Sequence, residues 1–354
     1  MNYGGNKMLL YYKEGCFFGV INYNGKIIYS PMFECVRDFR DDRMLVFKGG
    51  RGIYLGKEGE IETYFENTQL SSFKEGMAII GINEKYGYIN SKYKLRVPME
   101  YDSAYDFNDE IAVVEKDEKW GAVNKRGEVV IGLEYDYLGD NSEGYLVFEE
   151  NEKLGFLNKS GKKIIENEYD DVCEMRENRA FVCKDNKWGI INEKGEEVVT
   201  ICLDNSKIFT PDFGFREGAS YHCSEGRFAI LNINGDLITP YIFEGCTYYK
   251  EGICAVKEYN KWRFLDQNIR FINGESYESV GEFSEGLAAV KEDGKWGFIN
   301  KKGELVIPNV YDKVEPFKKG VARAILKGKD GFVDKHNRDL FRANNEILHP
   351  YHMF

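Results

Sequence analysis

The stretch Lys295–Pro308, KWGFINKKGELVIP, decides the fold of this chain, because versions of it recur along almost the whole sequence. We call the position of Trp296 the anchor. Its ten occupants are Phe18, Arg51, Tyr86, Trp120, Leu154, Trp188, Phe228, Trp262, Trp296 and Asp330. Successive anchors are about 34 residues apart, and only the interval from Trp188 to Phe228 is clearly longer. A nearly constant period of this kind indicates a tandem array of one supersecondary unit.

Each unit also carries its own turn signals. The anchor strand is followed by Asn-x-x-Gly, as in Asn22–Gly25 and Asn300–Gly303. Asn at the first position and Gly at the fourth favour a type I turn followed by a left-handed residue, which closes a short β-hairpin with a bulge. A second tight turn, Asp293-Gly294 in this unit, joins the apolar run Leu287–Val290 to the anchor strand. Each unit is therefore predicted to be an antiparallel meander of three or four strands, with the apolar strand buried on both faces.

Three further features repeat at fixed distances from the anchor. The next residue is Gly in eight of the ten units, which predicts a close approach of another backbone or ring. A branched side chain at Gly297 is therefore expected to overpack the interface between repeats. Tyr-Asp or a variant stands farther downstream, as at Tyr311-Asp312, and is followed by an aromatic–x–Glu–Gly step, as at Phe283–Gly286. Because these carboxylates recur, we predict that they accept backbone N–H bonds at turns.

The combined signature, Lys-Trp-Gly-Phe-Ile-Asn-x-x-Gly with downstream Tyr-Asp and Phe-x-Glu-Gly, resembles that of the bacterial WG-repeat (KWG) proteins. The resemblance extends roughly from Phe18 to Phe341. It implies a β-rich tandem repeat that serves as a binding or interaction module, and it brings no catalytic residues with it. The positions that depart from the signature are Arg51, Ala229, Arg263 and Asp330.

These patterns predict an all-β chain of about ten antiparallel β-meander repeats of about 34 residues over positions 1–343. Residues 344–354 are expected to form a C-terminal tail or cap. An open superhelical, solenoid-like stack is favoured, because propellers typically have about four to eight four-stranded blades. One or two β-propellers are the alternative.

Charge is unevenly distributed along the chain. The net charge is −11, and residues 295–354 carry twelve Lys or Arg against seven Asp or Glu, which leaves −16 on residues 1–294. This acidic majority argues against general nucleic-acid binding. The stretch Glu134–Glu152 has seven acidic residues and no Lys or Arg. It is interpreted as a solvated face or, alternatively, as a dock for a basic partner or a cation.

Motifs that would indicate catalysis or cofactor binding are missing from the sequence. There is no Gly-x-Ser-x-Gly, P-loop or His-Glu-x-x-His pattern, and the eight cysteines form no Cys-x-x-Cys pair. We therefore expect no enzyme activity, no metal site and no cofactor. No signal peptide and no apolar run of about 18 residues is recognised, so neither secretion nor a membrane span is expected. The scattered cysteines favour a cytoplasmic location.

The expected function is a non-enzymatic scaffold that recognises a protein or peptide through its repeat surface. One alternative is a carbohydrate or cell-envelope module that uses the anchor aromatics as a ladder, and another is an accessory component of a toxin or defence system. Burial of the anchors in the core between repeats is favoured over the ladder. Solvent exposure of Trp120, Trp188, Trp262 and Trp296 distinguishes these functions.

The largest irregularity of the array is Asn205–Tyr221, which carries six extra residues. Aromatic residues and Arg are enriched at binding hot spots, and insertions in repeat proteins map to loops on one face. Phe213, Phe215 and Arg216 are therefore predicted to contact the partner. The alternative is that this insertion folds back and covers a local gap.

Overall fold

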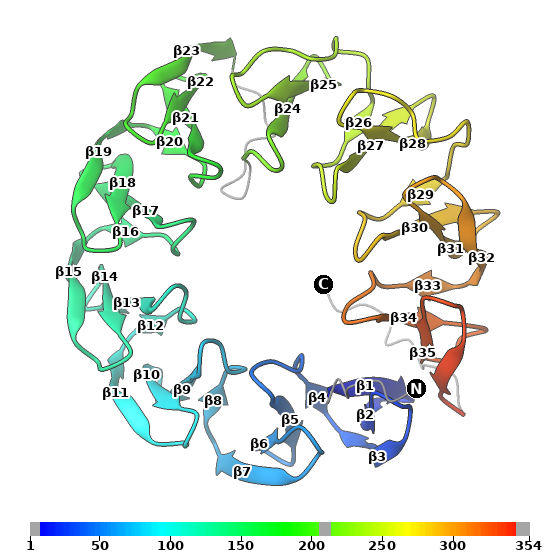
Figure 1. Ribbon diagram of the computed structural model, residues 1–354. Coiled ribbons are helices and arrows are strands. Elements are labelled where there is room, and N and C mark those ends of the chain that lie inside the picture. The colour runs from blue at the N-terminus through cyan, green and yellow to red at the C-terminus, as the bar shows by residue number, and fades with distance from the viewer. Residues whose placement is uncertain (1–7, 205–213, 345–354) are drawn as a thin grey trace. The chain divides into compact units, whose positions relative to one another are not determined.

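The computed structural model describes residues 8–204 and 214–344. It contains two compact units: unit 1 comprises Met1–Glu66, Gly226–Phe228 and Tyr241–Phe354, and unit 2 comprises Asn67–Glu225 and Ala229–Pro240. In the described ranges every regular element is a β-strand (Figure 1), which confirms the prediction of an all-β repeat chain. These ranges accordingly include no apolar helix of membrane-spanning length.

The described part of unit 1 contains five antiparallel sheets in which strands consecutive in sequence are neighbours. Their strands are β1 (Leu9–Glu14), β2 (Phe17–Asn22) and β3 (Ile27–Phe33); β4 (Cys35–Val36), β5 (Met44–Lys48), β6 (Arg51–Leu55) and β7 (Ile61–Glu66); β26 (Gly245–Cys246), β27 (Ile253–Glu258) and β28 (Lys261–Asp266); β29 (Ser279–Val280), β30 (Leu287–Glu292), β31 (Lys295–Asn300) and β32 (Leu305–Tyr311); and β33 (Lys313–Val314), β34 (Val321–Ile325), β35 (Gly331–Asp334) and β36 (Asp339–Arg342).

The sheets of unit 2 follow the same order. Their strands are β8 (Gln69–Leu70), β9 (Met77–Ile82), β10 (Lys85–Asn90) and β11 (Leu95–Tyr101); β12 (Ser103–Ala104), β13 (Ile111–Lys116), β14 (Lys119–Asn124) and β15 (Val129–Tyr135); β16 (Tyr137–Leu138), β17 (Tyr145–Glu150), β18 (Lys153–Asn158) and β19 (Lys163–Tyr169); β20 (Asp171–Val172), β21 (Arg179–Lys184), β22 (Lys187–Asn192) and β23 (Glu197–Asp204); and β24 (Ala219–Ser224) with β25 (Arg227–Asn232), which begins in unit 1. Each four-stranded sheet of the described ranges thus has a two-residue strand at one edge, and in all of these sheets except β33–β36 the longest strand lies at the other edge.

The predicted hairpin after the anchor strand is confirmed in atomic detail. Asn300 Oδ1 accepts hydrogen bonds from the backbone N–H of Lys302 at 2.9 Å and of Glu304 at 3.1 Å. Gly303 has φ +78°, where a Cβ atom is disfavoured. The Asn side chain therefore organises the turn, and the glycine closes it.

The glycine after the anchor makes the close approach that the sequence predicts. A Cβ on Gly297 would lie 2.4 Å from the carbonyl oxygen of Ile307 and 2.8 Å from the backbone nitrogen of Asn309. Both atoms belong to β32, the neighbouring strand of the same sheet, where the pairing register shifts between Trp296 and Phe298. The expectation that this contact lies between repeats is therefore wrong: a β-bulge within the sheet causes it.

The core lies between consecutive sheets. All of Ile111–Val114 in β13 is buried, which confirms that the apolar strand is covered on both faces. In unit 1, Phe298 and Ile307 of one repeat pack with Phe317 and Val333 of the next. Each sheet therefore buries its apolar faces against its neighbours, as expected for a repeat that cannot form a core alone.

The recurrent Glu of the aromatic–x–Glu–Gly step joins one repeat to the next. In unit 1, the Glu251 carboxylate accepts hydrogen bonds from the backbone N–H of Glu285 at 2.6 Å and of Gly286 at 2.9 Å. In unit 2, Glu75 accepts the same two bonds from Asp109 at 2.6 Å and Glu110 at 3.0 Å. In these repeats the turn is thus held by the turn before it.

The recurrent Asp of Tyr-Asp acts inside one repeat. Asp312 accepts a hydrogen bond from Lys295 Nζ at 2.5 Å, so the Lys and Asp of the signature form a pair. Its second oxygen accepts the backbone N–H of Gly328 at 2.8 Å. The predicted structural role of both recurrent carboxylates is confirmed.

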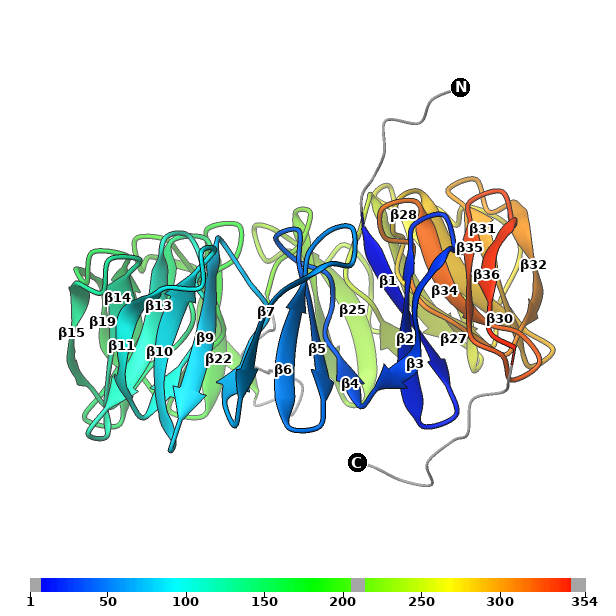
Figure 2. The ribbon, with the colours of Figure 1, turned by 90° about the horizontal axis from the view of Figure 1, so that it is seen from below.

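The first and last described repeats of unit 1 lie side by side, and Figure 2 shows β1 beside β34 and β35. The rings of Tyr12 and Phe341 are 4.5 Å apart between centroids. The backbone N–H of Lys13 donates a 2.8 Å hydrogen bond to Asp330 Oδ2. In an open stack each repeat contacts only its sequence neighbours. The favoured open stack is therefore wrong for the two ends of this array.

Candidate functional site

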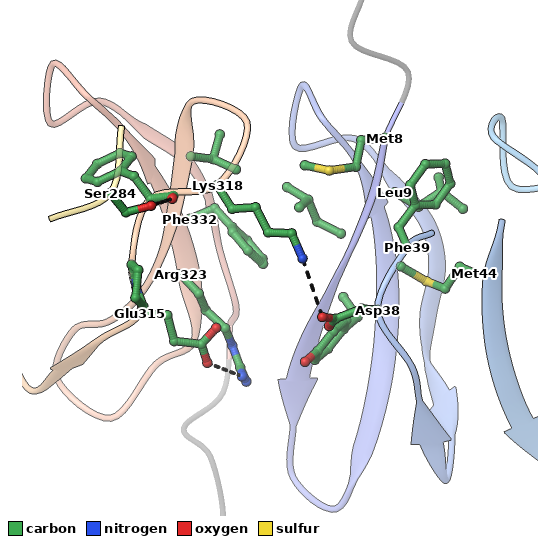
Figure 3. A pocket seen from close by; sticks show the side chains of 15 residues that line it. Met8, Leu9, Asp38, Phe39, Met44, Ser284, Glu315, Lys318, Arg323 and Phe332 are labelled. Carbon is green, nitrogen blue, oxygen red and sulfur yellow. Dashed lines mark hydrogen bonds and ion pairs between the residues drawn. The ribbon is translucent and has the colours of Figure 1, made fainter. Parts of the chain in front are cut away.

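A cavity of about 320 Å³ lies in unit 1 where the first two repeats meet the last one (Figure 3). One side is formed by the start of β1 and by the segment from Asp38 to Met44 before and at the start of β5. The other side is formed by residues of the last repeat between Glu315 and Phe332 and by Ser284 of the repeat before it. The volume falls at the lower end of the range that is typical of small-ligand pockets, about 300–1,000 Å³.

The walls of the cavity are apolar. Leu9 and Met44 are 1% and 0% exposed, and Figure 3 shows both on one side, with Phe332 opposite. Phe317 and Val321, from the loop before β34 and from β34 itself, complete the lining on the side of the last repeat. These residues belong to hydrophobic clusters of unit 1, and Val321 and Phe332 of the last repeat share their clusters with residues of the first repeat. The lining is therefore preformed by packing and suits an apolar side chain.

The rim of the cavity carries two charges of each sign, arranged as two ion pairs. Lys318 Nζ lies 3.5 Å from Asp38 Oδ2, across the two sides of the cavity. Arg323 Nη1 lies 3.1 Å from Glu315 Oε1. The first pair is well exposed and the second half-buried on its arginine side. The rim thus offers donors and acceptors close to an apolar floor.

Arg323 is held in place by a fully buried carboxylate. Asp330 is 0% exposed, and it accepts Arg323 Nη2–H at 2.6 Å and Nε–H at 2.8 Å. Asp330 also accepts the backbone N–H of Lys13 from β1. Burial alone would lower the pKa of Arg323, but the charge of Asp330 raises it overall. One aspartate at the anchor position therefore orients the rim arginine and connects the last repeat with the first.

The Tyr11 side chain lies beside this network. Arg323 Cζ is 5.4 Å from the centre of the Tyr11 ring, a cation–π distance. Burial is the main cause that raises the pKa of the Tyr11 hydroxyl, and Arg323 opposes it. The hydroxyl is thus protonated at neutral pH. The four charged side chains of the rim are thus paired with one another.

A family model described as "WG containing repeat" matches residues 18–51, 86–120, 120–153, 155–188, 229–262, 276–296 and 296–329, which together make up more than half of the chain. The chain belongs to the WG-repeat family. This confirms the resemblance that the Lys-Trp-Gly signature indicates. The match spans several repeats of each unit. No curated protein matches this WG-repeat protein.

Solved structures resemble the WG-repeat protein only distantly. The eukaryotic initiation factor structure is 11% identical over 96% of each chain, with a TM-score of 0.47. Dihydro-heme d1 dehydrogenase NirN is 13% identical over 86% of this chain and 73% of its own, with a TM-score of 0.39. Kluyveromyces lactis Hsv2p is 8% identical over 72% of this chain and 91% of its own, with a TM-score of 0.36. At these values the likenesses carry no functional argument.

The three residues predicted from the sequence to contact a partner do not form one surface in the described structure. Phe213 lies outside the described residues. Phe215 is 1% exposed and stacks on Phe181 at 5.4 Å between ring centroids. It therefore takes the place of the repeat aromatic of the aromatic–x–Glu–Gly step and is inaccessible to a partner here. Arg216 is half-buried next to it.

The anchor tryptophans of the WG-repeat protein do not form an exposed ladder. Trp188 is 3% exposed, and Trp120, Trp262 and Trp296 are half-buried. Trp262 and Trp296 pack against the core clusters of their repeats. This burial agrees with the interpretation of the anchors as core residues and does not favour carbohydrate binding along a ladder.

Part of the acidic stretch 134–152 has a structural role. Asp136 accepts hydrogen bonds from Lys119 Nζ at 2.5 Å and from the backbone N–H of Asn151 at 3.1 Å. Glu143 accepts the backbone N–H of Glu177 at 2.6 Å. Among the described residues no group of three or more His, Cys, Asp and Glu is arranged to hold a metal ion.

The cavity was missed from the sequence because its two sides come from opposite ends of the array. Asp38 and Lys318, for example, face each other across the cavity although one belongs to the second repeat and the other to the last. The one available signal was the anchor substitution at Asp330, since an aspartate in place of an aromatic residue requires a polar environment. The polar partners of Asp330 can be identified only in the structure, where the last repeat lies against the first.

Proposed function

We propose that this WG-repeat protein is a non-enzymatic binding module that takes an apolar side chain of a protein or peptide partner into the cavity of unit 1. The observation that supports this function is the preformed apolar cavity with its paired charges. Buried Leu9, Met44 and Phe332 would surround the apolar side chain. Asp38 and Lys318 on the rim would meet the flanking backbone or charged groups of the partner. Such a central apolar anchor with a polar rim is typical of protein interfaces.

We propose further that the array closes as a β-propeller. The contact between the first and last repeats supports it, since ends that pack on each other leave no terminal repeat with an uncovered face. The cavity would then be a feature of the closing joint, where the two repeats meet without the regular sequence linkage. Closure is tested separately from binding, through the joint residue Asp330.

A cytoplasmic location is also a proposal. It is supported by the seven described cysteines, all of which are free thiols. Free and largely buried cysteines fit a reducing compartment. Fractionation of the native host, followed by immunodetection, tests it.

Site-specific photocrosslinking tests the binding function. A benzophenone amino acid at Lys318, on the rim, is expected to crosslink one protein from native host lysate. The same group at Leu305, which is exposed in β32 away from the cavity, should give no such product. Mass spectrometry identifies the crosslinked protein and the segment that is attached. Equal crosslinking from both positions would argue against a partner at the cavity.

Affinity measurements with that purified partner complete the test. Leu10→Trp should fill the cavity and weaken binding at least about tenfold, which is about 1.4 kcal/mol. Leu95→Trp, on an exposed strand of unit 2, is the matched control. The melting temperature of each variant reports folding. If Leu10→Trp does not fold, the surface variant Asp38→Ala/Lys318→Ala replaces it. Unchanged affinity in a folded cavity variant would contradict the proposed function.

A further inference from the structure

Three aromatic side chains gather around the anchor Trp120 in unit 2. Tyr105 lies just after β12, Trp120 is in β14, and Tyr137 begins β16, so the group spans two consecutive sheets. The Trp120 ring is 5.5 Å from Tyr105 and 6.0 Å from Tyr137 between centroids, and both pairs are tilted. Tyr137 is 38% exposed, and the other two rings are half-buried. We call Tyr105, Trp120 and Tyr137 the aromatic cluster.

One of the two tyrosines precedes and the other follows the anchor Trp120, and both positions can be compared with those at the same offsets in other repeats. Among the ten anchors, only Trp120 has an aromatic residue at both of these offsets in the sequence. These positions hold small, polar or charged residues around four other anchors: Ser71 and Ser103 around Tyr86, Gly139 and Asp171 around Leu154, Thr247 and Ser279 around Trp262, and Gly281 and Lys313 around Trp296. The repeat therefore folds without aromatic residues there. Two added rings that remain partly exposed indicate a role at the surface.

A carboxylate accompanies the cluster. Asp140 is half-buried, it accepts the backbone N–H of Asn141 at 2.8 Å, and no ion pair joins it to any residue in the described ranges. Two reciprocal hydrogen bonds between Asn108 and Asn141, at 2.6 and 3.3 Å, hold the loop of Asp140 against the segment that follows Tyr105. Burial raises the pKa of Tyr105 and of Tyr137, and the negative charge of Asp140 contributes to both shifts. Burial likewise raises the pKa of Asp140 itself, although the charge of Lys74 acts in the opposite direction. A cationic group placed between the rings and this carboxylate would relieve the cost of burying its charge.

We propose that the aromatic cluster and Asp140 form a site for an arginine side chain of a basic peptide. A guanidinium group stacks on the faces of Trp and Tyr and pairs with a carboxylate, which are the two groups that this surface presents. The surrounding stretch Glu134–Glu152 has seven acidic residues and no Lys or Arg, and those that are not engaged at turns or with lysines, as Asp136 and Glu143 are, complement a basic segment. A neutral sugar would use the rings but gain nothing from the carboxylate. The site belongs to unit 2 and is independent of the cavity in unit 1.

Fluorescence anisotropy with a labelled peptide of alternating Arg and Gly tests this site. The full chain should bind the peptide, and binding should weaken as salt rises above about 0.15 M, because the charges are near the surface. The double variant Tyr105→Ser/Tyr137→Ser copies Ser71 and Ser103 of the preceding repeat and should fold. Its affinity is expected to be at least about tenfold lower. Asp140→Asn should weaken binding in the same direction.

The controls separate this proposal from the others. Trp296→Leu changes an anchor flanked by Gly281 and Lys313 and should leave peptide affinity unchanged, and so should the cavity variant Leu10→Trp. The proposal is overturned if the folded tyrosine double variant binds as the wild type does, or if the wild type does not bind. It is also overturned if a peptide with Gln in place of Arg binds equally well, because the cation would then be unnecessary.

Discussion

At the scale of single residues, the role of a recurring position can be found by comparing its occupants in different repeats. The glycine after the anchor is one such position, because the adjacent strand passes over it within the sheet. Where Gly19 stands, the atoms that a Cβ would meet belong to the Tyr12 ring instead. A side chain can move aside more easily than a strand of the sheet. Glycine is therefore required most strictly in repeats such as that of Gly297, where the adjacent strand places backbone atoms next to it.

Replacing Gly297 with Ala should therefore destabilise the protein by about 1–3 kcal/mol, the usual cost of overpacking. The added Cβ would meet backbone atoms of β32, which cannot move without breaking the sheet. Thermal unfolding followed by circular dichroism measures the effect. Gly274→Ala is the control, because that Cβ would enter open space. Equal melting temperatures for the two variants would remove the close-approach argument.

The turn asparagine gives a second residue-level prediction, with a natural control in the chain. Asn300 Oδ1 accepts two backbone hydrogen bonds, and Asp266 and Asp334 do the same in their repeats. Asn300 Nδ2 also donates a 2.7 Å hydrogen bond to Glu304 Oε2, and the fourth residue after Asp266 is Arg270. The double variant Asn300→Asp/Glu304→Arg copies Asp266 with Arg270 and should change the free energy of unfolding by less than about 0.5 kcal/mol. Asn300→Ala loses both bonds and should cost about 1–2 kcal/mol. Urea unfolding of both variants measures the difference, and equal stabilities would show that the backbone alone sets this turn.

At the scale of elements, carboxylates connect the turns of successive repeats. Glu285 continues the series, since it accepts the backbone N–H groups of Lys319 and Gly320. Burial by itself would raise the pKa of Glu75, Glu251 and Glu285, but hydrogen bonds from the next turn and from a lysine lower each of them overall. The lysines are Lys125, Lys301 and Lys335. The folded state therefore favours the ionised carboxylates.

This network predicts a definite dependence of stability on pH. A carboxylate whose pKa is lowered by folding stabilises the protein fully above its unfolded pKa, about 4.3 for Glu, and loses that contribution as pH falls through the folded value. The free energy of unfolding should thus fall as pH decreases from about 5 to 3. In the triple variant Glu75→Gln/Glu251→Gln/Glu285→Gln, the free energy of unfolding should fall less steeply over the same pH range.

The matched control for that slope is Glu84→Gln/Glu118→Gln/Glu152→Gln, which changes three exposed turn residues. These glutamates lie in the second tight turn of their repeats and do not hold the turn of a neighbour. Melting temperatures at a series of pH values compare the two triple variants. If both variants flatten the slope equally, overall charge and not the turn network governs the acid sensitivity.

The elements themselves were largely predictable from the sequence. The turns and the apolar strands depend on local turn geometry and local burial, which sequence patterns indicate directly. Examples are Asn22–Gly25 and Leu287–Val290. The residues predicted to contact a partner show a limit of sequence analysis, because Phe215 looks like part of an insertion until the structure shows it stacked on Phe181 in the core. Tyr105 and Tyr137 were overlooked for a different reason. They belong to different repeats, and only the packing of two sheets around Trp120 brings their rings together.

At the scale of the whole molecule, the question is how the ends of the array are joined. The joint of the first and last repeats is more polar than the regular contacts, since buried Asp330 bonds both Arg323 and the backbone of Lys13. A buried ion pair of this kind is a poor source of net stability, but it is sensitive to the loss of one partner. The hydrogen bonds of this joint therefore form only when the first and last repeats are in contact.

Asp330→Asn tests whether this joint holds the ends together. The change removes the buried partner of Arg323, leaves it only the more exposed Glu315, and should cost up to about 3–5 kcal/mol. The informative measurement is amide hydrogen exchange. In a closed array, destabilising the last repeat should also increase the exchange rate in β1 (Leu9–Glu14). Exchange in β13 (Ile111–Lys116) of unit 2 serves as the internal reference. Protection should fall in β1 and β35 and remain near the wild-type value in β13.

Asp312→Asn is the matched control, since it removes a carboxylate of the same repeat that bonds only within its own end of the chain, at Lys295 and Gly328. It should leave exchange in β1 unchanged. If Asp330→Asn also left β1 fully protected, the first and last repeats would be independently stable and closure would not contribute to the fold. If β1 loses protection in Asp330→Asn but not in Asp312→Asn, a substitution in the last repeat destabilises the first repeat. A linear array in which each repeat contacts only its sequence neighbours does not allow this effect.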